Sequence, residues 1–68
     1  MNKQWKNEWI SVDDRLPEAY NEVLVFAKYG LIEICYFHNG ENIWVHGCGH
    51  FDREDITHWM PLPEFPKN

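Results

Sequence analysis

The stretch EVLVFAKYGLIEICYFHNGENIWVH, residues 22–46, decides the fold because two turn signals separate runs of β-branched and aromatic residues. Tyr29-Gly30 lies between the first two runs, and glycine can take the positive φ that a tight two-residue hairpin turn needs. Asn39-Gly40 lies between the second and third runs, and this pair is the one best suited to a type I′ turn. The sequence therefore predicts three consecutive antiparallel strands, a meander.

These turns also predict which side chains share a face of the sheet, because alternate residues of a strand point to opposite sides. With Tyr29-Gly30 as the turn, Val25 lies opposite Ile34 and Phe26 lies opposite Glu33. One predicted face then carries core residue types only: Val23, Val25, Ala27, Ile32, Ile34, Tyr36, Ile43 and Val45. The other face is mixed: Leu24, Phe26, Lys28, Leu31, Glu33, Cys35, Phe37 and Trp44. We expect the first face to form the core.

Segments on both sides of the meander predict further strands. Trp9 and Ile10 begin a short strand, and the turn residues after it allow at most one helical turn. Residues 46–55 form a predicted loop, and ITHWM, residues 56–60, is a predicted closing strand. Alternation along this strand places Thr57 and Trp59 on one side and Ile56, His58 and Met60 on the other. The prolines from Pro61 onward end the strand because they lack the N–H that a ladder needs.

The predicted fold class is thus mostly β: an antiparallel three-stranded meander joined by N-terminal and C-terminal strands. Closure into a barrel-like sheet and a small α+β variant stay open as alternatives. The whole chain, residues 1–68, is expected to be a single small domain. Residues 1–8 are expected to be a flexible N-terminus, and residues 61–68 a proline-rich tail.

Composition and charge exclude several classes of function. The formal net charge of −5 disfavours direct binding of nucleic acid, although mimicry of nucleic acid by the carboxylates stays open. The longest apolar run, residues 23–27, is far shorter than the roughly 20 residues that span a bilayer. With two cysteines and a polar start, the chain is expected to be cytoplasmic, with reduced thiols. Whether it is a monomer or a homo-oligomer is left undecided.

Three segments carry a resemblance to a known family: WISVDDRLPE at residues 9–18, EVLVFA at residues 22–27 and ITHWMPLPE at residues 56–64. In these the chain resembles the family catalogued as domain of unknown function 551. The resemblance implies a small phage or prophage protein, working in the bacterial host cytoplasm, with no assigned activity and no catalytic residue. It also implies a set of structural signature positions: Trp9, Leu16, Pro17, His58, Trp59, Pro61, Leu62 and Pro63.

HGCGHFD, residues 46–52, is the stretch that could carry chemistry. His46, Cys48 and His50 stand at alternate positions and are ligand types that zinc takes tetrahedrally. A small metal-binding or thiol-dependent protein is therefore the alternative function, with zinc as its cofactor. The simpler interpretation is a flexible surface loop without a cofactor. We interpret His58 as a structural histidine whose ring bonds a backbone carbonyl.

The mixed face of the predicted sheet suggests a different function. Phe26, Phe37 and Trp44 would be exposed there beside Glu33 unless another part of the chain covers them. Aromatic residues rimmed by charge are typical of an interface hot spot, so we expect Trp44 to anchor a protein partner of unknown identity. The expected function is a non-enzymatic phage protein that binds and modulates a host or viral protein, with antiviral defence proteins among the candidates.

Overall fold

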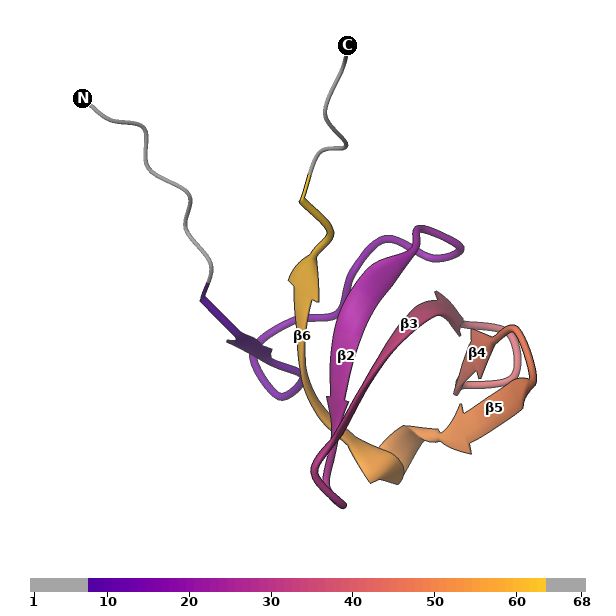
Figure 1. The fold of residues 1–68 in the computed structure, drawn as a ribbon. Coiled ribbons are helices and arrows are strands. Elements are labelled where there is room, and N and C mark those ends of the chain that lie inside the picture. Colours follow the sequence, from indigo (N-terminus) through magenta and orange to yellow (C-terminus); the bar gives the residue numbers. More distant parts are fainter. Residues whose placement is uncertain (1–7, 64–68) are drawn as a thin grey trace, which may run out of the picture.

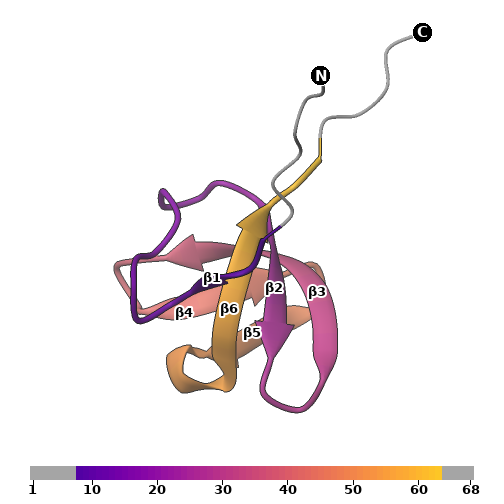
Figure 2. The same ribbon diagram turned by 90° about the vertical axis from the view of Figure 1, so that its left-hand side faces the viewer.

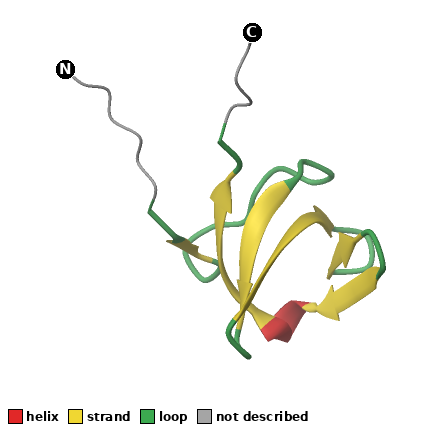
Figure 3. Cartoon of the chain, in the orientation of Figure 1, coloured by secondary structure: helices red, strands yellow, loops and turns green. Residues whose placement is uncertain are grey.

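The computed structural model describes residues 8–63 as one six-stranded antiparallel sheet, shown in Figures 1 and 3. The elements in chain order are β1 (Ile10–Ser11), β2 (Val23–Ala27), β3 (Leu31–His38), β4 (Ile43–His46), β5 (Gly49–Asp52), η1 (Arg53–Asp55) and β6 (Ile56–Pro61). The spatial order β1-β6-β2-β3-β4-β5 places the last strand between the first two. The mostly β fold class is confirmed, and the described sheet is open rather than barrel-like.

The sheet folds back on itself because β3 takes part in two ladders. Its first half pairs with β2, and its second half pairs with β4. Figure 2 shows the result: β6 and β2 lie in front, and β4 and β5 lie behind them. The core fills the space between these layers and consists of Val23, Val25, Ala27, Cys35, Phe37, Trp44, Ile56 and Trp59.

The turn between β2 and β3 contains three residues, so the predicted two-residue turn is wrong. Ala27 lies opposite Leu31, and Val25 lies opposite Glu33 rather than Ile34. Gly30 takes a φ of 90° and donates a 2.8 Å hydrogen bond to the carbonyl oxygen of Ala27. A turn followed by one left-handed residue is a common three-residue hairpin connection. The extra residue reverses the two faces of β3 relative to the prediction.

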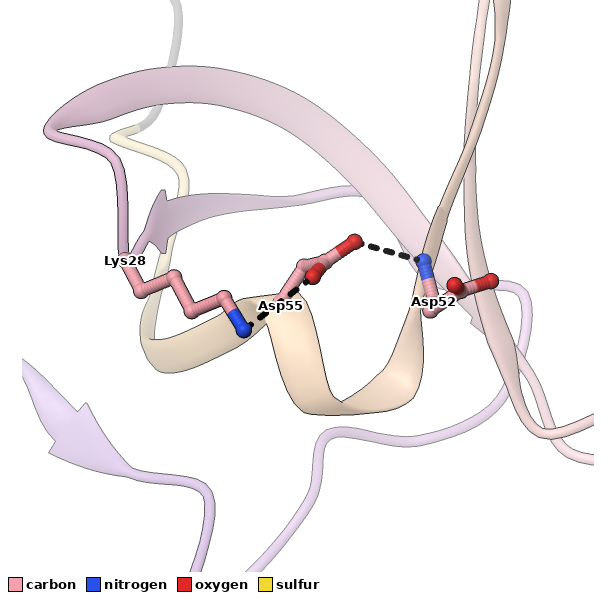
Figure 4. Close-up of polar contacts among 3 residues, drawn as sticks. All are labelled: Lys28, Asp52 and Asp55. Carbon is pink, nitrogen blue, oxygen red and sulfur yellow. Dashed lines mark hydrogen bonds and ion pairs between the residues drawn. The ribbon is translucent and has the colours of Figure 1, made fainter.

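A contact with η1 explains why Lys28 belongs to the turn. Its backbone N–H donates a 2.8 Å hydrogen bond to the carbonyl oxygen of Asp55. Figure 4 shows the second contact, between the Lys28 Nζ and the Asp55 Oδ1 at 3.6 Å. The other carboxylate oxygen of Asp55 accepts a 3.3 Å hydrogen bond from the backbone N–H of Asp52. In a two-residue turn at Tyr29-Gly30, the Lys28 N–H would pair with β3. In the structure it bonds to Asp55 of η1 instead.

The turn between β3 and β4 contains four residues, so the predicted type I′ turn at Asn39-Gly40 is also wrong. His38 lies opposite Ile43. Asn42, not Gly40, takes the left-handed conformation, with a φ of 62°. Its backbone N–H donates a 2.7 Å hydrogen bond to the carbonyl oxygen of His38, and its side chain accepts a 2.9 Å bond from Arg53. A shift of two residues keeps the faces of β3 and β4 in phase.

The predicted loop at residues 46–55 contains a strand. β5 pairs with β4 through a two-residue turn at residues 47 and 48, so that Trp44 lies opposite Phe51 and Val45 lies opposite His50. Its Gly-His-Phe-Asp sequence has only one strong strand former, which is why the pattern predicts a loop. β5 forms because its backbone pairs with β4, which stabilises an extended conformation that its own residues favour only weakly.

The closing strand β6 is confirmed, but its side-chain alternation is interrupted. The ladder with β2 shifts between Phe26 and Ala27, which lie opposite His58 and Ile56, respectively. Thr57 is therefore the extra residue of a β-bulge. The bulge brings Ile56 and Trp59 to the same side, where both are buried, and the prediction that they lie on opposite sides is wrong.

The segment between β1 and β2 closes one end of the core. Residues 12–14 form a turn rather than a helix, and the Ser11 hydroxyl accepts a 3.1 Å hydrogen bond from the backbone N–H of Asp13. The Trp59 indole N–H donates a 2.9 Å bond to the carbonyl oxygen of Arg15, which ties this segment to β6.

Within residues 8–63 the three-residue turn η1 is the single helix, and it is too short to cross a membrane. The predicted flexible N-terminus lies almost wholly outside the described residues, as does the end of the proline-rich tail.

Candidate protein-binding face

The side of β6, β2 and β3 that points away from the core forms a continuous surface, which we call the outer face. Its registers place Leu24 between Ile34 and Met60, and Phe26 between Ile32 and His58. The ring of Trp9 packs on Phe26 with a centroid distance of 5.9 Å. The members of the outer face are Trp9, Leu24, Phe26, Ile32, Ile34, Tyr36, His58 and Met60. None of these residues is an Asp, Glu, Lys or Arg.

Exposure of aliphatic side chains distinguishes this face from an ordinary solvated sheet surface. Ile32 and Ile34 are 54% and 46% exposed. A one-sided sheet normally carries polar residues at such positions. β3 is instead apolar on both sides, because Cys35 and Phe37 are buried in the core. Contiguous exposed apolar surface marks an interaction site more often than single exposed residues do.

A small hollow lies at one end of the outer face. It has a volume of about 220 Å³ and is lined by Trp9, Phe26 and His58. The Nδ1 of His58 lies 2.9 Å from the Thr57 hydroxyl, which donates a 3.3 Å hydrogen bond to the carbonyl oxygen of Phe26. We expected the His58 ring to bond a backbone carbonyl directly. In the structure its Nδ1 contacts the Thr57 hydroxyl, and this hydroxyl bonds the carbonyl oxygen of Phe26. The volume of the hollow is sufficient for one apolar side chain.

The predicted partner-binding residues are mostly in the wrong place. Trp44 and Phe37 are 0% and 3% exposed and pack together in the core at a centroid distance of 5.0 Å, so neither can anchor a partner on the surface. The physical reason is the three-residue turn, which reverses the faces of β3 and carries β4 with it. Glu33 lies half-buried on the core side, opposite Val25. Phe26 alone of the four lies on the outer face.

The structure separates the predicted metal ligands. His50 lies opposite Val45, whereas His46 lies one position further along β4, so the two rings point to opposite sides of the hairpin. His46 packs on Phe51 at a centroid distance of 5.0 Å, and its Nδ1 accepts a 3.2 Å hydrogen bond from the backbone N–H of Cys48, whose side chain is exposed. Among residues 8–63, no three His, Cys, Asp or Glu side chains come together as a metal site requires. The alternative zinc function gains no support from this geometry.

The signature positions lie in several parts of the structure. Leu16, Pro17 and Trp59 pack in or against the core, whereas Trp9 and His58 lie at the hollow of the outer face. Trp59 and Pro17 also line a second hollow of about 360 Å³ at the end of the sheet, together with Pro61 and Leu62. Pro63 is exposed.

Within residues 8–63, two groups have a shifted pKa. Burial, and secondly the charge of Glu33, raise the pKa of the Cys35 thiol from 9.0 to about 12, so this thiol stays protonated and unreactive at neutral pH. A hydrogen bond to Asp55 raises the pKa of Tyr29. Neither group lies on the outer face, whose only imidazole is His58. The site therefore offers apolar contact rather than nucleophilic chemistry.

The sequence pattern predicts Ile32 and Ile34 in the core, but both are surface residues in the structure. The signal that could have found them is the apolar character of both faces over residues 31–37. Because only one side of β3 can face the core, the apolar side chains on its other side must lie at the surface.

Comparisons with known proteins agree with the resemblance seen in the sequence. A family model described as "Protein of unknown function (DUF551)" matches residues 8–67, nearly the whole chain. No curated protein and no solved structure matches the chain.

Proposed function

Since the chain belongs to the DUF551 family, which is described only as of unknown function, we propose its function from its surface. It is a non-enzymatic protein that binds another protein through the outer face. Phage or prophage origin and a place in the host cytoplasm are part of the same proposal and rest on the resemblance. The partner is then a host or viral protein whose action is modulated by occupation of its surface, and antiviral defence proteins are among the candidates.

The observation that carries this proposal is the pair of half-exposed side chains Ile32 and Ile34 on the β3 side of an apolar face. Complete burial of an aliphatic side chain stabilises by about 1.5–3 kcal/mol relative to full exposure, so two half-exposed isoleucines leave a comparable gain for a complex. Phe26, Trp9 and the hollow beside His58 extend the contact. Central apolar anchors with a pocket nearby are typical of protein interfaces.

Charge favours a protein partner over a nucleic acid. The chain has a formal net charge of −5, which repels a phosphate backbone on average. The outer face has no arginine or lysine to neutralise phosphates, and its members are aliphatic, aromatic or imidazole side chains. Such a surface fits the apolar centre of an interface better than a nucleic-acid groove.

Site-directed photo-crosslinking in bacterial cells tests the proposal. A photoreactive phenylalanine analogue replaces Ile32 or Ile34 on the outer face, and Asn39 in the exposed second turn as a matched control. We expect one discrete crosslinked protein from both outer-face positions and none from the control. Ile32→Ser with the analogue at position 34 should remove this product while the purified variant keeps the melting temperature of the wild type within a few degrees.

The proposal is wrong if both outer-face positions give no product above the control, or if Ile32→Ser leaves the product unchanged. A product from the control position alone would assign binding to the second turn instead.

A further inference from the structure

One edge of β3 is open along half of the strand. β2 occupies one side of residues 31–35, and β4 pairs only with Tyr36, Phe37 and His38 on the other side. Among residues 8–63 no strand or loop backbone hydrogen-bonds to the remaining side of residues 31–35. Figure 2 shows this first half of β3 at the border of the sheet. Its unpaired N–H and C=O groups are a template for another extended chain.

The side chains on this open edge do not protect it. Natural edge strands are usually blunted by lysine, proline, a bulge or a covering loop. Leu31, Ile32 and Ile34 are instead apolar and about half exposed, and no bulge interrupts the pairing of this segment with β2. Residues 31–35 therefore offer a partner both unpaired backbone groups and apolar side chains. The rest of the outer face offers apolar side chains only.

Glu33 is the one charged residue of the open edge. It lies half-buried on the core side, between the exposed Ile32 and Ile34 on the outer side. Within residues 8–63 no lysine, arginine or histidine nitrogen lies within 4.0 Å of its carboxylate. A half-buried carboxylate is stabilised when a cation comes within about 4–6 Å. A strand added at this edge places its middle residue on the same side as Glu33.

We propose that residues 31–35 of β3 bind an extended segment of the partner protein as an added strand, and that this segment has a basic residue between two apolar ones. The two apolar side chains pack on Ile32 and Ile34 on the outer side, and the basic side chain reaches Glu33 on the other. This inference rests on the proposed function, since it uses the same face, and it defines the class of partner segment.

A second copy of the chain fits this edge less well. In the antiparallel pairing that places Ile32 opposite the second copy's Ile34, the two Glu33 carboxylates face each other. Each copy also brings a formal net charge of −5, which opposes association. A basic residue in the added strand removes the first conflict and lessens the second.

A fluorescent nonapeptide with the sequence Thr-Ser-Thr-Val-Arg-Val-Thr-Ser-Thr and blocked ends serves as the probe, titrated with the full chain and followed by anisotropy. We expect saturable binding. Methylation of backbone nitrogens at alternate peptide positions should weaken it at least tenfold in one set, either the odd-numbered or the even-numbered positions, and change it little in the other set. Only alternate N–H groups of an added strand point to the neighbouring strand, so this period of two is specific to strand addition.

A charge exchange tests the role of Glu33. The peptide with Glu in place of Arg should bind the wild type at least tenfold more weakly and regain affinity for Glu33→Arg. Glu41→Arg makes the same charge change in the exposed second turn and is the matched control, expected to rescue no affinity. Glu33→Gln, the milder variant, should weaken binding of the Arg peptide even if Glu33→Arg does not fold.

The failures of the two proposals are distinguishable. Equal effects of methylation in both sets of positions, or no saturable binding of the probe, overturn strand addition, whereas crosslinks at Ile32 and Ile34 would then still support the outer face. A dimer in sedimentation that Ile32→Ser dissociates makes the second copy the occupant and overturns the inference.

Discussion

The two turns of the meander differ in a way that decides which side chains are buried. Both are longer than the two-residue turns that their sequences favour: the first contains three residues and the second four. The first excess is odd and reverses the faces of the following strand, whereas the second excess is even and keeps them. One extra residue at Lys28 therefore moves Phe37 and Trp44 into the core and Ile32 and Ile34 to the surface.

Contacts with a distant part of the chain outweigh local turn chemistry at the first turn. Tyr29-Gly30 is a good two-residue turn in isolation, but the hydrogen bond from the Lys28 N–H to Asp55 holds the chain in another register. Because residues 31–37 are apolar on both sides, hydrophobicity alone does not oppose the change.

Deletion of Tyr29 should have the largest effect. It shortens the first turn to two residues, which either reverses β3 against the core or breaks the contact of Lys28 with Asp55. We expect no cooperative thermal unfolding, because a domain of this size has only about 3–5 kcal/mol of stability to lose. A variant that melts cooperatively near the wild-type temperature would contradict the argument that an odd number of extra turn residues decides which face of β3 is buried.

Deletion of Glu41 and Asn42 is the matched control for the second turn, because it removes two residues and keeps the faces in phase. It loses the Arg53–Asn42 hydrogen bond, for which about 0.5–1.5 kcal/mol is expected. We expect a folded variant with a lower melting temperature, checked by circular dichroism.

Trp44→Ala comes next in size. The indole is fully buried beside Phe37, so the free energy of unfolding should fall by about 3–5 kcal/mol. Its N–H has no hydrogen-bond partner within the described residues, so the loss comes from packing. Because this loss is comparable with the whole stability of the domain, we expect a largely unfolded variant by circular dichroism without urea. A loss under about 1 kcal/mol in urea unfolding would return Trp44 to the surface position that the sequence predicted.

The pH dependence of stability reports on Cys35. Above pH 9.0 the unfolded chain loses the thiol proton, whereas the native chain keeps it up to about pH 12. The free energy of unfolding should therefore fall through this window, by at most about 1.4 kcal/mol per pH unit. Tyr29, whose pKa is also raised, contributes in the same direction.

Urea unfolding at several pH values should show a shallower decline in Cys35→Ala, and an unchanged one in the control Cys48→Ala, which alters an exposed thiol. Equal slopes in all three proteins would place Cys35 outside the core.

The smallest effect is expected at Ile34. Ile34→Ala should change the free energy of unfolding by less than about 1 kcal/mol, because the side chain is 46% exposed. Ile56→Ala is the same chemical change at a buried position and should cost about 2–5 kcal/mol. Parallel urea unfolding curves compare them, and similar losses would show that the outer face is covered in the protein.

Much of the architecture was predictable from the sequence, because β-branched runs and turn residues mark the meander, and Trp59 with Pro61 marks the closing strand. The registers were not, since the first depends on a contact with Asp55 and the last on a bulge at Thr57, neither of which has a local signal. Of the candidate site, Phe26 was predicted correctly to lie on the face away from the core, where it is half-buried beside Trp9, whereas Trp44 and Phe37 lie in the core. β5 was missed because its strand depends on pairing with β4.

The position of β6 between β1 and β2 has a consequence for synthesis. Ile10 leaves the ribosome early, but its partner Trp59 is made only after every other strand residue of the core. The nascent chain can form its hairpins one by one, yet their apolar sides stay open until β6 enters between strands that are already complete. Completion of the sheet therefore waits for β6 and depends on non-local pairing, which is slow compared with local contacts. Until β6 is in place, the unfinished sheet exposes the apolar side chains that later form the core, and such surface is prone to aggregation.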